Sequence, residues 1–205
     1  MPKVAVLLGS LRRPGMGFGI ASWLTPLVRQ SFQTARTSTP DASSVDVVLV
    51  DPTQPPLPLG PIVDGSHVPA DIRDPTKHPN PAVREWAMFV TSCSGFIILC
   101  PEYNKSYPGE LKNTFDHLYW EWARKPVMVV AYGGGGGARV EEALRGMLGG
   151  PFKMQVADKG VGIKWPRGTD KVPPEGPAPK WLQAYEPEVL AAVEELNGLI
   201  LKNKA

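Results

Sequence analysis

Residues 4–19 read VAVLLGSLRRPGMGFG, a short apolar run followed by a turn rich in glycine. The apolar run predicts a strand that is buried on both faces. Residues 17–30 then carry apolar side chains at helical spacing, so we expect a helix after the turn, kinked or shortened at Pro26. A strand, a glycine-rich turn and a helix in this order are typical of the first unit of an α/β fold.

The alternation of strands and helices continues to the end of the chain. Apolar runs predict buried strands at 45–50, 96–100 and 127–132, and a weaker one within 156–163. Helical periodicity predicts helices at 81–92, 110–123, 138–148 and 181–201. These elements predict an α/β protein with a parallel sheet covered on both faces. Proline-rich loops at 52–81 and 166–180 are expected to belong to this one domain of residues 1–205.

The charge balance restricts the class of protein. The 205 residues include 22 Lys and Arg against 20 Asp and Glu, a net charge of +2. This balance argues against a nucleic-acid-binding protein and against a strongly acidic electron carrier. The apolar run near the N-terminus is too short for a signal peptide, and no run reaches membrane-spanning length. Two cysteines make no disulfide framework, so we expect a soluble, cytoplasmic protein.

The loop at residues 9–19 has the composition of a phosphate-binding turn. Its glycines let the backbone approach a ligand closely. Free N–H groups at the start of the following helix, the Ser10 hydroxyl and the Arg12 guanidinium all suit a phosphate. The alternative is an ordinary strand-to-helix turn with solvated arginines. A P-loop is excluded because Pro14 stands where its second glycine is required, and the dinucleotide-binding pattern fails at its third glycine.

A longer and more specific segment follows the third predicted strand. Residues 101–113 read PEYNKSYPGELKN. Ligands of open α/β sheets bind at the carboxyl ends of the strands, and this segment begins at such an end. With the Gly-Ser-x-Arg pattern at residues 9–12 and with Asp116, it resembles the NADPH-dependent FMN reductase family, and the resemblance covers residues 3–150. The alternative is that the segment is a loop and a turn without function.

The resemblance implies a flavodoxin-like fold, which is a three-layer sandwich whose five-stranded parallel sheet has the order 2-1-3-4-5. It implies FMN as the cofactor and NAD(P)H as the co-substrate. NAD(P)H then delivers hydride to N5 of FMN, and a second substrate takes the electrons at the same face, so we expect ping-pong kinetics and no catalytic side chain. The acceptor is expected to be a quinone, an azo compound, a metal oxyanion or free flavin. Relatives are usually homodimers or homotetramers, so a homo-oligomer is expected.

The resemblance also assigns cofactor-binding residues. Those expected to hold the FMN phosphate are Ser10, Arg12 and the backbone of Met16, Gly17 and Phe18. Those expected to line the isoalloxazine ring are Pro101, Glu102, Tyr103, Asn104, Gly133 and Gly134. Many relatives carry a polar or basic residue where Gly15 stands, so either one phosphate contact is missing here or Arg13 supplies it.

Two other functions stay open beside the reductase. One is a flavodoxin-like electron carrier that does not turn over pyridine nucleotides, which the net charge disfavours. The other is a non-catalytic FMN-binding or scaffold module.

Five consecutive glycines at 133–137 allow two interpretations. Gly133, Gly135 and Ala138 fit a dinucleotide-binding fingerprint, and Asp158 lies at a suitable distance downstream. A run of five glycines satisfies almost any glycine spacing, however. We therefore favour a flexible loop that passes close to a flat ring, where a side chain would collide.

Histidines and cysteines are expected to do no chemistry. His67, His78 and His117 show no metal-ligand spacing, so no metal site is predicted. We expect the first two to be solvated in the proline-rich loop and the third to lie on a helix surface. Cys93 and Cys100 lie in or beside apolar runs and are expected to be buried structural residues.

Two large aromatic residues fall outside the apolar stripe of the helix expected at 110–123. They are Tyr119 and Trp120. Aromatic side chains beyond the core stripe suggest a subunit interface. The alternative is that the loop at 52–81 covers them.

Overall fold

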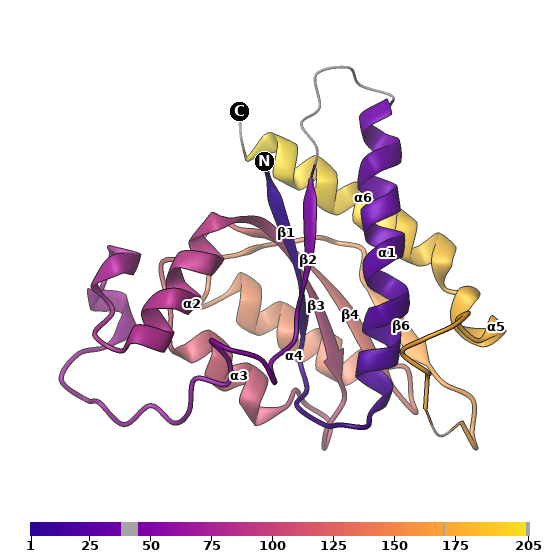
Figure 1. Cartoon of the computed structure of the whole chain (residues 1–205), viewed down its shortest axis with the longest axis horizontal. Coiled ribbons are helices and arrows are strands. Elements are labelled where there is room, and N and C mark those ends of the chain that lie inside the picture. Colours follow the sequence, from indigo (N-terminus) through magenta and orange to yellow (C-terminus); the bar gives the residue numbers. More distant parts are fainter. Residues whose placement is uncertain (38–44, 170, 204–205) are drawn as a thin grey trace.

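A parallel sheet forms the middle layer of the fold, with the strand order β2-β1-β3-β4-β5 and with β6 also paired to β4 (Figure 1). The computed structural model describes residues 1–37, 45–169 and 171–203. The strands are β1 (Lys3–Leu8), β2 (Asp46–Val50), β3 (Cys93–Pro101), β4 (Pro126–Gly133), β5 (Gln155–Val156) and β6 (Val161–Lys164). The helices are α1 (Met16–Thr37), α2 (Pro81–Ser92), α3 (Gly109–Asp116), α4 (Ala138–Gly149), α5 (Lys180–Gln183) and α6 (Glu186–Lys202). The expected flavodoxin-like order 2-1-3-4-5 is confirmed.

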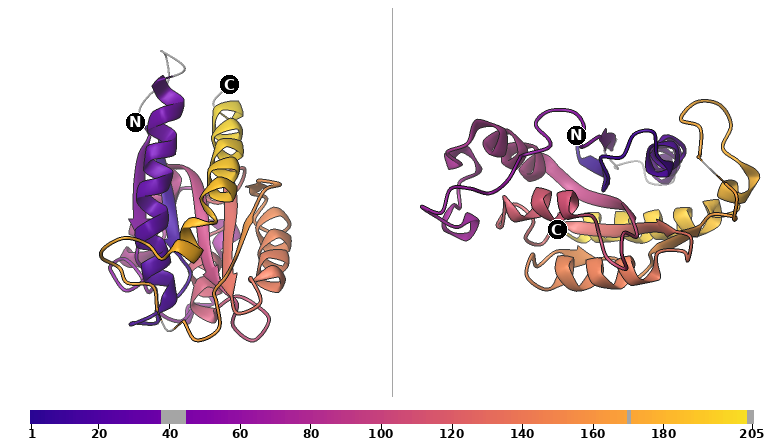
Figure 2. Two further views of the ribbon diagram at one scale, coloured as in Figure 1. Left: turned by 90° about the vertical axis from the view of Figure 1, so that its right-hand side faces the viewer. Right: turned by 90° about the horizontal axis from the view of Figure 1, so that it is seen from below.

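Helices cover both faces of the sheet, which explains why the strands are apolar throughout. Along β1, Val4 and Val6 pack into the core beneath α1 and α6, whereas Ala5 and Leu7 pack into the core beneath α2, α3 and α4. Both faces of the strand are therefore buried. α1 and α6 lie side by side on their face of the sheet (Figure 2). Among the described residues, no helix is both long and apolar enough to cross a membrane.

The weak fifth strand expected within 156–163 is two short strands. β5 pairs with the first residues of β4, and β6 pairs with its last residues. Between them, side chains bind the backbone and interrupt the ladder. The Arg145 guanidinium donates to the carbonyl oxygens of Ala157 and Asp158 at 2.7 and 2.9 Å, and the Glu195 carboxylate accepts from the N–H of Asp158 at 2.7 Å.

The first and the last of the expected helices differ from the structure. α1 is not shortened at Pro26, because Leu24 and Val28 on either side of the proline are both buried against the sheet and hold the 22-residue helix together. The single helix expected at 181–201 is divided into α5 and α6, and Pro187 stands in the first turn of α6. Proline is well tolerated in the first turn, where its missing N–H is not needed.

The helix expected at 110–123 ends at Asp116. After it, the Glu121 carboxylate accepts a hydrogen bond from the backbone N–H of Tyr119 at 3.2 Å, and the Trp122 indole donates to the carbonyl of Phe115 at 3.2 Å. These contacts replace helical hydrogen bonds. The chain turns, yet Phe115 and Trp122 both reach the core, with ring centroids 4.4 Å apart. The apolar pattern correctly predicted which residues reach the core, but it did not predict where the helix ends.

The proline-rich loop contacts the aromatic residues that follow α3. Trp120 donates from its indole N–H to the carbonyl of Ala70 at 2.7 Å, and the Arg73 guanidinium lies 4.0 Å from the centre of the Trp120 ring. These contacts favour the second interpretation, in which the loop covers Trp120.

The expectation that His78 is solvated is wrong. Its side chain is only 2% exposed, because its Nε2 lies 2.8 Å from the equally buried Glu121 carboxylate. The charge partner that permits this burial is 43 residues away in the sequence.

Candidate functional site

A cavity of about 220 Å³ opens at the carboxyl ends of β1, β3, β4 and β6. This is the edge where ligands of open α/β sheets bind. Its predicted lining residues are Ser10, Arg12, Met16, Gly17, Pro101, Glu102 and Tyr103, and Arg13 lines it as well. Four further lining residues had not been predicted to bind the cofactor: Pro14, Gly15, Tyr132 and Trp165. Phe18, Asn104, Gly133 and Gly134 were predicted but are not among the residues that line it.

Ser10 connects the two loops that form the cavity. Its hydroxyl lies 2.8 Å from the hydroxyl of Tyr103, and it accepts a hydrogen bond from the backbone N–H of Arg12 at 3.2 Å. The residue is 3% exposed. A buried hydroxyl with partners in both loops holds the first βα loop against the segment that follows β3.

The two arginines of the first loop differ in their charge partners. Arg13 donates to the Asp51 carboxylate at 2.6 Å and to the carbonyl of Ser10 at 3.2 Å. Arg12 lies over the ring of Tyr103, 4.0 Å from its centre, and has no ion-pair partner among the described residues. Arg12 is therefore the arginine whose charge is free to bind an anion.

Asp51 stays ionised beside Arg13. Partial burial acts to raise the pKa of the Asp51 carboxyl, but hydrogen bonds from Thr53 and Arg13 outweigh it, so the pKa lies below its usual value. The Arg13 charge is thus compensated across the neutral pH range. If Arg13 supplies the phosphate contact that many relatives make from the position of Gly15, its guanidinium has to bind the phosphate and the Asp51 carboxylate at the same time.

The start of α1 also faces the cavity. The first turn of α1 contains no acidic residue, and the first N–H groups of a helix lack partners within the helix. Gly17 is required here because a Cβ at this position would lie 2.1 Å from the hydroxyl oxygen of Tyr132. Glycine thus lets the buried phenol approach the beginning of the helix, where an anion is favoured.

Tyr132 was missed because it stands within an apolar strand. Its side chain is almost fully buried, and burial raises the pKa of the phenol far above its usual value. The hydroxyl has no hydrogen-bond partner in the described part of the chain, yet it belongs to a residue that lines the cavity. A neutral phenol whose hydroxyl is unpaired at a cavity wall is available to a ligand.

The segment after β3 is held by backbone hydrogen bonds. The N–H of Glu102 donates to the carbonyl of Tyr132 at 2.9 Å, and Tyr103 and Ser106 form a two-residue hairpin turn. Asn104 occupies the tip of this turn with a φ of +51°. Asparagine tolerates this conformation well. The turn points Asn104 into solvent, which explains why it is absent from the cavity wall.

The glycine loop at 133–137 has two different parts. At Gly137, with a φ of +77°, a Cβ would lie 2.9 Å from the Cβ of Ala131, so glycine is needed by the protein itself. At Gly134 a Cβ would meet no atom within 4 Å. The expectation of a collision with bound flavin therefore stays a prediction for Gly134.

The cysteines are free and buried, as expected. Burial raises the pKa of the Cys93 thiol to about 11 and raises that of Cys100 further. Neutral thiols at physiological pH are poor nucleophiles.

The sequence matches the family described as NADPH-dependent FMN reductase over residues 2–164. The NAD(P)H-dependent FMN reductase LOT6 of Saccharomyces cerevisiae is 33% identical over 171 residues, which cover 83% of this chain and 85% of that protein. The NAD(P)H-dependent FMN reductase ntnL of Nectria sp is 29% identical over 212 residues, with full coverage of both chains. An NADPH:quinone oxidoreductase of Arabidopsis thaliana is 29% identical over 150 residues, which cover 70% of this chain and 64% of that protein.

The fold is also shared with solved structures. An oxidoreductase from Corynebacterium diphtheriae superimposes with a TM-score of 0.67 at 16% identity, covering 98% of each chain. At this identity the likeness concerns the fold. The family match over residues 2–164 and the relative from Saccharomyces cerevisiae show that the chain belongs to the NADPH-dependent FMN reductase family, whose enzymes use FMN with NAD(P)H.

Proposed function

We propose that this enzyme passes electrons from NAD(P)H to a small quinone through FMN bound in the cavity at the carboxyl ends of β1, β3 and β4. The observation that carries this proposal is that Arg12, whose guanidinium has no ion-pair partner among the described residues, lines one cavity together with Ser10 and the start of α1. A cation, a hydroxyl and free helix N–H groups together suit a phosphate monoester. The quinone is supported by the relative from Arabidopsis thaliana that is named for this acceptor.

The residues of the first loop bind the phosphate in this proposal. Arg12 leaves the face of Tyr103 and forms a charge-assisted pair with the phosphate, while the backbone N–H groups of Met16, Gly17 and Phe18 donate to its oxygens. Phe18 is not among the residues that line the cavity, and in this proposal it contributes only its backbone N–H at the start of α1. Tyr132 donates its unpaired hydroxyl to the phosphate or the adjoining ribityl chain.

The other end of the cavity orients the ring. Pro101, Glu102, Tyr103 and Trp165 also line the cavity, and the ring centre of Trp165 lies 6.2 Å from that of Tyr132. Aromatic and proline walls hold a flat ring by burying its apolar surface. A Cβ at Gly134 would meet no atom within 4 Å, and in this proposal the open space at this glycine admits the nicotinamide and the quinone.

The protein has no side chain that must exchange a proton in this scheme. When FMN is bound, it supplies the redox chemistry, because it can accept a hydride and then donate two electrons. The chain orients the partners and excludes water from the buried face. Because donor and acceptor use the same face in turn, the kinetics are expected to be ping-pong.

Anaerobic mixing of the FMN-loaded protein with NADPH or NADH tests the proposal. The flavin absorbance near 450 nm is followed, and a benzoquinone is then added. Rapid bleaching that the quinone reverses supports the reductase. Flavin that stays oxidised with both nucleotides contradicts it and favours the electron carrier, and a protein that retains no FMN contradicts the assignment of the cavity.

A further inference from the structure

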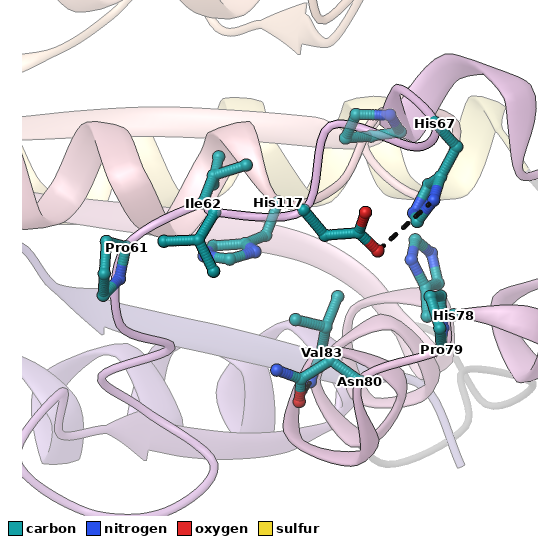
Figure 3. Close-up of a pocket in the computed structure, with 11 residues that line it drawn as sticks. Pro61, Ile62, His67, His78, Pro79, Asn80, Val83 and His117 are labelled. Atoms are coloured by element: carbon teal, nitrogen blue, oxygen red, sulfur yellow. Dashed lines mark hydrogen bonds and ion pairs between the residues drawn. The ribbon is translucent and has the colours of Figure 1, made fainter.

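A second cavity, of about 270 Å³, lies between the proline-rich loop, the beginning of α2 and the end of α3 (Figure 3). No residue lines both this cavity and the one beside Arg12. Its apolar wall consists of Pro61, Ile62, Val63, Pro69, Pro79 and Val83. The volume is at the small end for ligand sites and matches a molecule of one or two rings.

One polar residue of the wall, His78, belongs to a buried histidine–carboxylate pair. His78 lines the cavity, and its Nε2 lies 2.8 Å from Glu121, with each side chain only 2% exposed. Glu121 is held in place, since it also accepts the backbone N–H of Tyr119. The carboxylate orients the imidazole, so Nε2 carries a proton and donates to Glu121.

The other ring nitrogen of His78 is unsatisfied by the protein. Its Nδ1 has no hydrogen-bond partner in the described part of the chain. Among the described residues, Thr25 Oγ1 is the one side-chain nitrogen or oxygen that is both fully buried and without a hydrogen-bond partner. Because His78 Nδ1 also lacks a partner, it is not fully buried. Nδ1 therefore reaches the cavity that His78 lines.

Besides His78, four polar residues line the cavity: Asp64, His67, Asn80 and His117. Asp64, the one carboxylate among the lining residues, lies 3.8 Å from His67 Nδ1, as the dashed line in Figure 3 shows. His117 is held by a contact of 3.1 Å between its Nε2 and the carbonyl of Gly60. His78 is the one polar lining residue that is buried, so a ligand that pairs with its free ring nitrogen lies among the apolar residues of the wall, which favours an uncharged group there.

We propose that this second cavity binds an uncharged phenolic compound of one or two rings, whose hydroxyl pairs with His78 Nδ1 while its ring packs against Ile62 and Val83. A hydroxyl matches this nitrogen in either protonation state, because it can donate to the neutral imidazole and accept from the charged one. A carbonyl or an ether oxygen serves only one of these states.

Titration of the FMN-loaded protein with 2-naphthol tests the proposal, and 2-methoxynaphthalene is the matched ligand that lacks the donor. Calorimetry should show one naphthol site and about fivefold weaker binding of the methoxy compound, the loss expected for one neutral hydrogen bond. His78→Gln keeps an amide donor for Glu121 but removes the nitrogen that faces the cavity. It should weaken naphthol binding about fivefold and leave the methoxy compound unaffected. Equal binding of the two ligands to the native protein overturns the proposal.

Ile62→Glu provides a test that does not disturb the buried pair. Ile62 is 51% exposed, and Met88, which is 52% exposed and does not line the cavity, gives the matched control Met88→Glu. Ile62→Glu should abolish naphthol binding and Met88→Glu should preserve it. Unchanged binding in Ile62→Glu places the ligand elsewhere, including the flavin site. If sedimentation shows an oligomer that Ile62→Glu alone dissociates, a second copy covers the wall, and this result overturns the proposal as well.

Discussion

Replacing Arg12 with alanine should weaken FMN binding without weakening riboflavin binding. Arg12 lies in the first βα loop and has no ion-pair partner among the described residues, so its charge is available to the phosphate. Riboflavin has the same ring and ribityl chain but no phosphate. The comparison therefore isolates the contact between the guanidinium and the phosphate.

The size of the effect follows from two opposing contributions. A hydrogen bond to a charged group contributes about 1.5–3 kcal/mol. Arg12 must first leave the Tyr103 ring, whose centre lies 4.0 Å from its guanidinium. An exposed cation–π contact of this kind contributes about 0.5–1 kcal/mol. The net loss of about 1–2 kcal/mol corresponds to a dissociation constant for FMN that is about 5–30 times higher.

Quenching of flavin fluorescence on addition of apoprotein gives both dissociation constants. Arg73→Ala is the matched control, because Arg73 is also exposed and also lies 4.0 Å from an aromatic ring centre, that of Trp120. Arg12→Lys should lose less FMN affinity than Arg12→Ala, since it keeps the charge but not the fork. Equal loss of riboflavin and FMN affinity in Arg12→Ala would refute the reasoning, and so would an equal loss of FMN affinity in Arg73→Ala.

Three further predictions concern the cavity wall and the buried cysteines. Tyr132→Phe should leave the melting temperature unchanged, because the hydroxyl has no partner in the described chain, and should raise the dissociation constant for FMN about two- to tenfold; an unchanged dissociation constant would remove the hydroxyl from the site. Gly17→Ala places a Cβ 2.1 Å from the Tyr132 hydroxyl and should cost about 1–3 kcal/mol in urea unfolding, partly recovered in the double variant Gly17→Ala/Tyr132→Phe, whereas Gly134→Ala should be neutral; strictly additive effects would contradict the contact. Iodoacetamide at pH 8 should label neither cysteine in the folded protein, because both are buried and the Cys93 thiol stays neutral up to a pKa of about 11; mass spectrometry showing labelling before unfolding would disprove it.

The sequence predicted most of the candidate site because local patterns carry it. Seven of the eleven predicted residues line the cavity, since the first βα loop and the segment after β3 must meet where their parallel strands end. Tyr132 and Trp165 could not be found in the same way. Tyr132 stands within an apolar strand, where a core role is the ordinary expectation. Trp165 directly follows the short strand β6, which the sequence marked only weakly.

Local patterns also predicted which segments form helices and strands better than they predicted where these helices and strands end. Apolar periodicity correctly identified Phe115 and Trp122 as core residues. It could not show that the chain leaves the helix at Asp116, because the contacts made by Glu121 and the Trp122 indole depend on the tertiary structure. A residue can reach the core from a helix or from a turn, and its hydrophobicity does not distinguish the two.

The sequence by itself determined that strands such as β1 lie in the middle of a sheet, because a continuous apolar run can be buried only between two covering layers. It also predicted that a glycine-rich loop with Ser10 and Arg12 stands at the carboxyl ends of the strands, the edge where open α/β sheets bind ligands. Only the tertiary structure decided which arginine is free, since Asp51 neutralises Arg13 from 38 residues away. It also decided that His78 is buried, because a polar side chain can leave water only when its partner, here Glu121, is brought to it by the fold.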